Sequence, residues 1–137
     1  MPPPYKAVVC FSYAAFPSFL HNSMQLTGTL YTYNEENRLT AFESGDVKSP
    51  NSVVFIGGLS DGYNAVPFLE PLTAALAKIG WSLIQVQLSS SYTGFGISSL
   101  QKDSTELDYL VEYLKNKRQK QKIMFLGHST GKDAEDE

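Results

Sequence analysis

Cysteine, tryptophan and histidine are scarce in this chain, whose 137 residues include one Cys, one Trp and two His. Cys10 has no second cysteine with which to form an internal disulfide, and no group of Cys and His residues has the spacing of metal ligands. We therefore expect a fold without disulfides, metals or other cofactors. A lone cysteine also favours a reducing compartment, so the composition is typical of a cytoplasmic protein.

Long apolar runs are missing as well. No stretch approaches the roughly 20 apolar residues that a membrane-spanning helix needs, so no membrane partner is expected. Lys6 and the apolar segment 7–16 have some features of a signal peptide. The single basic residue and the interruption by Pro17 argue against that interpretation.

An excess of positive charge is also absent, because 11 Lys and Arg residues face 14 Asp and Glu residues, for a formal charge of -3. Segment 132–137 holds four of the acidic residues and one Lys, so the rest of the chain is neutral. Without a broad basic surface, nucleic acid is not expected as a partner. The length is typical of a single domain.

The order of apolar segments predicts an α/β fold that begins with a β-hairpin. Residues 25–33 and 38–43 are rich in strand-forming residues and flank a polar turn at 34–37. A continuous apolar run at residues 52–56 is typical of a strand buried on both faces, and further strands are predicted at residues 81–88 and 122–126. Residues 1–24 are expected to be irregular, and 132–137 to form an acidic tail.

Two amphipathic helices are predicted between these buried strands. The first begins at Asn64 as N-cap and ends at Gly80 in a left-handed conformation. Its apolar stripe consists of Phe68, Leu72, Leu76 and Ile79. The second carries Leu107, Leu110, Val111 and Leu114 at helical spacing, with Lys115, Lys117 and Arg118 placed to complement the helix dipole. The order implies a parallel sheet with right-handed crossovers and functional loops at the carboxyl ends of its strands.

A G-x-S-x-G sequence, GHSTG at residues 127–131, follows the last predicted strand directly. In a nucleophile elbow the serine occupies a strained strand-to-helix turn, and glycines two positions away on either side prevent clashes. Ser129 is therefore the candidate nucleophile, with Gly127 and Gly131 as the elbow glycines. The alternative is a Gly/Ser-rich turn without catalytic function.

A second match, GLSDG at residues 58–62, also follows a predicted strand. In hydrolases with this architecture, one oxyanion donor is the backbone N–H after the nucleophile and another comes from the loop after an earlier strand. Thr130 and Leu59 fit those two roles, and we favour this interpretation. A nucleophilic Ser60 and a plain tight turn remain as alternatives.

Two other interpretations of these residues are weaker. The segment GHSTGKD has three residues between its glycines where a P-loop has four, and Asp133 stands where a P-loop has Ser or Thr. His128 is expected to face away from the side on which Ser129 presents its hydroxyl, because consecutive strand residues alternate. His21 lies in the irregular opening and is a poor candidate for a general base.

Four segments in the expected order resemble the DUF1749 family, α/β-hydrolase-like proteins of fungi and plants that include a fungal siderophore esterase. The segments are residues 28–43, 54–67, 89–100 and 125–131. The resemblance implies the N-terminal half of an α/β-hydrolase fold over residues 25–131, a β-hairpin followed by parallel βαβαβ. It also implies a serine esterase acting on a small-molecule ester, with Ser129 as nucleophile and Thr130 and Leu59 as oxyanion donors.

The same resemblance assigns the loop residues around the expected site. The glycines of the first loop are Gly57, Gly58 and Gly62, and the substrate-rim candidates are Ser60, Asp61, Tyr92 and Phe95. In such enzymes the acid and the histidine follow the nucleophile along the chain. Here no histidine follows Ser129, so we expect a chain truncated after the elbow and inactive alone.

Two further hypotheses stay open at this stage. A non-catalytic fragment would pair with a partner through the sheet edge left open beyond residues 122–126. An unusual enzyme would instead use Ser60 together with His128.

Overall fold

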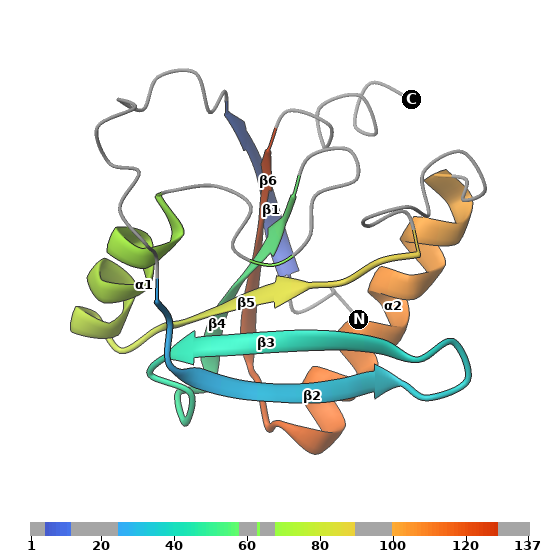
Figure 1. The fold of residues 1–137 in the computed structure, drawn as a ribbon, viewed down its shortest axis with the longest axis horizontal. Helices are drawn as coiled ribbons and strands as arrows, with labels where there is room; N and C mark the ends of the chain where they lie inside the picture. The colour runs from blue at the N-terminus through green and yellow to red at the C-terminus, as the bar shows by residue number, and fades with distance from the viewer. Residues whose placement is uncertain (1–4, 12–24, 58–62, 64–67, 90–99, 129–137) are drawn as a thin grey trace.

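The computed structural model describes residues 5–11, 25–57, 63, 68–89 and 100–128, with only the backbone for 5–11, 100–103 and 128. Within these ranges, six strands form one sheet and two helices pack on it (Figure 1). The strands are β1 (Tyr5–Phe11), β2 (Gly28–Asn34), β3 (Leu39–Gly45), β4 (Asn51–Ile56), β5 (Ser82–Val86) and β6 (Lys122–His128). The helices are α1 (Leu69–Lys78) and α2 (Leu100–Lys117).

The strand order in the sheet is β1-β6-β4-β5-β3-β2. β1, β6, β4 and β5 are mutually parallel, whereas β3 runs antiparallel to β5 and to β2. Across the six strands the right-handed twist accumulates, so β2 and β3 cross the view in Figure 1 while β1 and β6 run up it. The predicted hairpin, the parallel strands and the antiparallel edge are thus confirmed.

β1 corrects the expectation of an irregular opening. Its backbone pairs in parallel with β6 from Tyr5 opposite Ile123 to Phe11 opposite His128. The sequence YKAVVCF contains the apolar and β-branched residues that favour a strand. The strand forms by pairing with a segment that is distant in the sequence. Local sequence does not reveal that partner, because β6 lies more than 100 residues further along the chain. The outer edge of β6, which we expected to be open, is therefore paired.

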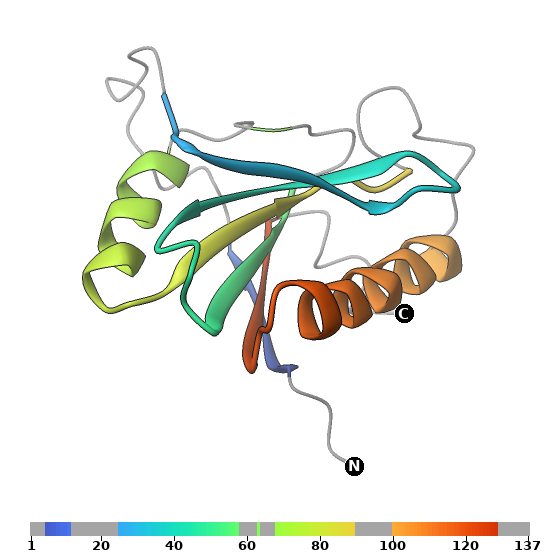
Figure 2. The same ribbon diagram turned by 90° about the horizontal axis from the view of Figure 1, so that it is seen from below.

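α1 and α2 cover opposite faces of the sheet, as Figure 2 shows from below. Strand residues alternate between the two faces, so Val54 and Ile84 pack in one core while Phe55 and Leu83 pack in the other. The α2 core includes the predicted stripe of Leu110, Val111 and Leu114, with Leu107 packed against it. The α1 core contains Phe68, whose ring meets that of Phe55 edge-on at 5.7 Å between centroids.

α1 begins later than the sequence predicts. Its N-cap is Phe68 rather than Asn64, and no side chain caps it. Ile79 does not complete the apolar stripe, because it follows the last helical turn and is 67% exposed. The predicted ending at Gly80 is confirmed: with φ of 77°, its N–H donates to Ala77 O and that of Trp81 donates to Leu76 O. These two bonds satisfy carbonyls that the last turn leaves free.

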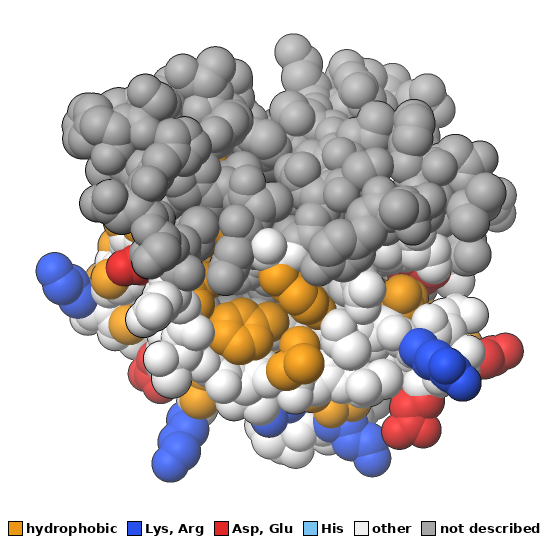
Figure 3. Space-filling model, in the orientation of Figure 1, with side chains coloured by type: hydrophobic (Ala, Val, Ile, Leu, Met, Phe, Trp, Pro, Cys, Tyr) orange, Lys and Arg blue, Asp and Glu red, His pale blue; other side chains and the backbone are white. Residues whose placement is uncertain are grey.

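β2 is an edge strand, and its outward face carries Leu30 at 60% exposure. Figure 3 shows hydrophobic side chains near the centre of this side of the molecule and charged side chains along its lower rim. Neither helix in the described residues combines the length and apolarity needed to cross a bilayer.

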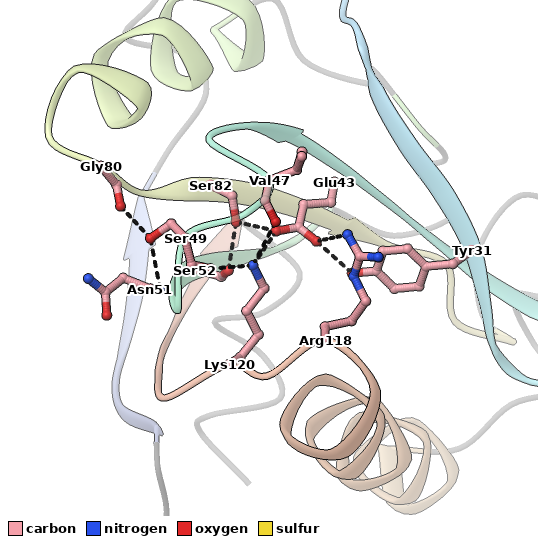
Figure 4. Close-up of polar contacts among 10 residues, drawn as sticks. All are labelled: Tyr31, Glu43, Val47, Ser49, Asn51, Ser52, Gly80, Ser82, Arg118 and Lys120. Carbon is pink, nitrogen blue, oxygen red and sulfur yellow. Dashed lines mark hydrogen bonds and ion pairs between the residues drawn. The ribbon is translucent and has the colours of Figure 1, made fainter.

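A buried ion pair joins elements far apart in the sequence at the amino ends of the parallel strands (Figure 4). Lys120 Nζ lies 2.5 Å from Glu43 Oε2, and both side chains are inaccessible to solvent. The ammonium also donates to Ser49 O and Val47 O, so each of its three protons has an acceptor. The pair ties β3 and the turn after it to the connection between α2 and β6.

Hydroxyl groups complete the coordination of the Glu43 carboxylate. Ser82 Oγ donates to Oε2 at 2.6 Å and itself accepts from Ser52 Oγ at 2.6 Å. On the other side, Arg118 Nη2 lies 3.2 Å from Oε1, and its guanidinium stacks over the Tyr31 ring at 4.7 Å. Ser52 and Ser82, near the starts of β4 and β5, thereby join the same network as the hairpin.

Tyr31 also donates its hydroxyl to Glu43 Oε1, at 3.3 Å. Burial, reinforced by the nearby Glu43 carboxylate, raises the pKa of the Tyr31 phenol well above its usual range. The phenol therefore stays protonated at neutral pH and remains a donor to the Glu43 carboxylate.

We predict that Glu43→Gln lowers the free energy of unfolding by about 3–5 kcal/mol, because it leaves the buried Lys120 charge unpaired. Urea denaturation followed by circular dichroism measures the change. Glu35→Gln, at an exposed position of the hairpin turn, is the matched control and should leave the midpoint unchanged. Combining Glu43→Gln with Lys120→Met should recover much of the loss, and an additive double variant would refute an ion-pair origin.

Candidate active site

Three parallel strands end side by side at one edge of the sheet. Ile56 at the end of β4 lies opposite Gly127 of β6, and Phe55 lies opposite Gln85 of β5. Paired strands are about 4.8 Å apart, so the segments that follow β4, β5 and β6 leave from neighbouring positions. These are the segments in which the sequence places the oxyanion loop, the substrate rim and the nucleophile elbow.

Among the predicted site residues, the structure describes Gly57 and Gly127. Gly57 follows β4 directly and is half-buried, and Gly127 is buried within β6. The strand continues through Gly127 to His128, two residues beyond the predicted end. The other site candidates lie outside the described residues: Leu59, Ser129, Thr130, Gly58, Gly62, Gly131, Ser60, Asp61, Tyr92 and Phe95.

Of the two histidines, His128 is placed only by its backbone and His21 lies outside the described residues. The backbone of His128 pairs with Phe11 of β1 at the end of the strand. His128 directly precedes Ser129 in the sequence, and its backbone lies at the sheet edge where β4 also ends.

Sequence reasoning missed a polar cluster at this edge. Tyr63 OH lies 2.5 Å from Thr40 Oγ1, which donates to Gln87 Oε1 at 3.0 Å. The Gln87 backbone is held as well, since its N–H donates to Thr40 O and its carbonyl accepts from Tyr33 OH. Thr40 is the second residue of β3, Gln87 directly follows β5, and Tyr63 comes after β4 in the chain, so the cluster joins three segments.

A second anchor holds the start of the segment after β5. The Ser89 N–H donates to Glu106 Oε1 at 2.8 Å, and its hydroxyl donates to Oε2 of the same carboxylate. Glu106 lies on α2 and is 2% exposed, and the two Ser89 donors supply the hydrogen bonds that a buried carboxyl group needs. One feature of the sequence could have indicated this contact: Glu106 is an acidic residue next to Leu107, at the helix face predicted to be apolar.

No group of three or more His, Cys, Asp or Glu side chains within the described ranges is arranged to hold a metal ion. The polar side chains described above at the carboxyl edge are hydroxyls, the Gln87 amide and the Glu106 carboxylate.

The architecture matches solved hydrolase structures. A siderophore hydrolase, EstB from Aspergillus fumigatus, superposes with a TM-score of 0.67 at 33% sequence identity, covering 76% of this chain and 33% of that one. A hairpin and parallel strands with helices on both faces define part of an α/β-hydrolase fold. Residues 20–134 match the model of DUF1749, described as a protein family of unknown function. The chain belongs to this family.

Two curated relatives extend the comparison. UPF0613 protein PB24D3.06c of Schizosaccharomyces pombe is 40% identical over 116 residues, which are 76% of this chain and 36% of the relative. Fusarinine C esterase sidJ of Aspergillus fumigatus is 32% identical over 114 residues, 77% of this chain and 32% of the relative. The chain thus spans about a third of the length of these relatives, less than the half that we expected.

We predict that Glu106→Gln destabilises the start of the segment after β5, because an amide cannot accept both Ser89 protons as the carboxylate does. The free energy of unfolding, measured by urea denaturation, should fall by about 1–2 kcal/mol. The Ser89 amide hydrogen should also exchange faster with solvent. Glu112→Gln, exposed on the same helix, is the matched control. Equal behaviour of the two variants would contradict the assigned role of Glu106.

Proposed function

We propose that this chain carries the nucleophile segment of a carboxylic-ester hydrolase. The observation that carries the proposal is the pairing of Ile56 with Gly127. Because β4 and β6 are adjacent strands, the segment after β4 and the segment after β6 start from neighbouring positions. An oxyanion site needs this proximity, because its two N–H donors come from the β4 loop and from the residue after the nucleophile. The hydrolase relatives in the family support the same reaction class.

In the proposed reaction, Ser129 Oγ attacks the carbonyl carbon of the ester and transfers its proton to a general base. The backbone N–H groups of Leu59 and Thr130 bind the oxyanion of the tetrahedral intermediate. The C–O bond to the leaving alcohol then breaks, and the alcohol takes the proton from the base. Water hydrolyses the acyl-serine by the same sequence, which releases the acid and restores the serine.

A siderophore ester is the proposed substrate class. Two of the proteins to which the chain is similar are a siderophore hydrolase and a fusarinine C esterase, both from Aspergillus fumigatus. The rim candidates Ser60, Asp61, Tyr92 and Phe95 are proposed to face this substrate.

The general base is the component that these 137 residues lack after the nucleophile, since no histidine follows Ser129. Without a base within hydrogen-bond reach, a serine hydroxyl is almost wholly protonated and a weak nucleophile. We therefore propose that the 137-residue chain does not turn over esters by itself. The non-catalytic fragment is the second candidate: β1 occupies the edge of β6 that we expected to be open, and the edge strands of the described sheet are β1 and β2.

A chimera tests the assignment. Residues 25–131 of this chain replace the matching segment of the siderophore hydrolase EstB, which supplies the remaining two thirds of the fold. The chimera should hydrolyse 4-nitrophenyl acetate and react with a fluorophosphonate probe. Ser129→Ala should reduce the rate by at least about 1,000-fold, the usual loss on removing a nucleophile. Ser60→Ala tests the second candidate nucleophile and should retain labelling by the probe.

Hydrolysis that survives Ser129→Ala but not Ser60→Ala would transfer the nucleophile role to Ser60. Fusarinine C in place of the nitrophenyl ester tests the substrate class separately. For the 137-residue chain alone we expect no labelling above that of its Ser129→Ala variant, and specific labelling of Ser129 would contradict the proposed inactivity.

A further inference from the structure

We propose that Thr40 is a positioning residue that fastens the segment carrying the oxyanion donor to the β-hairpin. The proposal rests on the function proposed above for Leu59. Thr40 itself touches no reacting atom, and it acts through Tyr63.

The directions of the hydrogen bonds are determined by chemistry. Gln87 Oε1 can only accept, so the Thr40 hydroxyl proton points to it across 3.0 Å. The Thr40 oxygen is then left as the acceptor for the Tyr63 phenol at 2.5 Å. Gln87 Oε1 also accepts the Thr40 N–H at 3.2 Å, which holds the amide in one orientation. The result is an ordered series of donors from Tyr63 through Thr40 to Gln87.

The hydrogen bonds from Tyr63 through Thr40 to Gln87 matter because Tyr63 lies close in sequence to the proposed oxyanion donor Leu59. Gly57 follows the end of β4, and Tyr63 is six residues later, so the segment between them is held at both ends. Leu59 lies within that segment, two residues from Gly57 and four from Tyr63. Fixing both ends of so short a segment restricts the positions open to the Leu59 N–H, and oxyanion stabilisation requires donors that are already in place.

A ring contact also holds Tyr63 against β3, but this contact does not require the Tyr63 hydroxyl. The Tyr63 ring lies 6.4 Å from the ring of Phe42, which is two residues from Thr40 and therefore on the same face of β3. A phenylalanine at position 63 could keep this ring contact. The phenol adds a directional bond to β3, and that bond is the testable part of the inference.

Thr40 serves the segment after β5 through the same atoms. Its carbonyl accepts the Gln87 N–H at 3.0 Å, and its side chain binds the Gln87 amide. Gln87 precedes Ser89, from which the substrate-rim segment begins. One threonine of the hairpin thus connects the segments proposed to hold the oxyanion donor and the substrate.

The test is hydrogen–deuterium exchange, resolved by peptide mass, on the 137-residue chain. Thr40→Val keeps the shape of the side chain and removes the hydroxyl, and Tyr63→Phe removes the donor without altering β3. Both variants should speed exchange of the amides of residues 57–63 by about fivefold, the effect of losing one hydrogen bond. Thr40→Ser restores the hydroxyl and should restore protection. Thr32→Val, exposed on β2 opposite Thr40, is the matched control and should behave as wild type.

Unchanged exchange at 57–63 in both Thr40→Val and Tyr63→Phe would overturn the proposal. Faster exchange spread evenly over all six strands would also overturn it, because Thr40 would then be only a stabilising residue. Ser129→Ala should leave the exchange at 57–63 as in wild type, so the anchor is measured independently of ester chemistry. Loss of the anchor and loss of the proposed hydrolase function therefore give different results.

Discussion

The buried pair of Glu43 and Lys120 is the interaction on which the rest of the sheet depends. Two charges without solvent contact are tolerated only when each is paired and fully hydrogen-bonded, which leaves them a single arrangement. That arrangement specifies the register of β3 against β5, because a slip of one residue would move Glu43 to the opposite face. It also holds the connection into β6, the strand that leads to the proposed nucleophile.

The two ends of the sheet have different roles. At the amino ends of the parallel strands, the Glu43 carboxylate is satisfied by Lys120, Arg118, Tyr31 and Ser82. At the carboxyl ends, Thr40, Gln87, Tyr63 and the Ser89–Glu106 contact hold the bases of loops. Stability is thus concentrated at one edge, and the segments proposed for chemistry leave from the other, as is usual for parallel α/β sheets.

Most helices and strands could be predicted because their signals are local. The hairpin, the buried strands and the apolar stripe of α2 follow from short-range periodicity. Gly80 follows the end of α1 because glycine readily adopts the positive φ found there. The start of α1 was misplaced because Asn64 has the chemistry of a cap, while burial of Phe68 and Leu69 decides where the helix packs. β1 was missed because its partner is remote in sequence.

The sequence by itself determined the order of elements from β2 to β6, the family and the chemical type of each candidate residue, since these depend on side-chain identity and short spacing. Only the tertiary structure decided that Ile56 and Gly127 are neighbours, that β1 pairs with β6, and that Thr40 lies between Tyr63 and Gln87. The physical reason is that these contacts join residues more than 20 positions apart. Such contacts form through the packing of the whole sheet, and no local pattern encodes them.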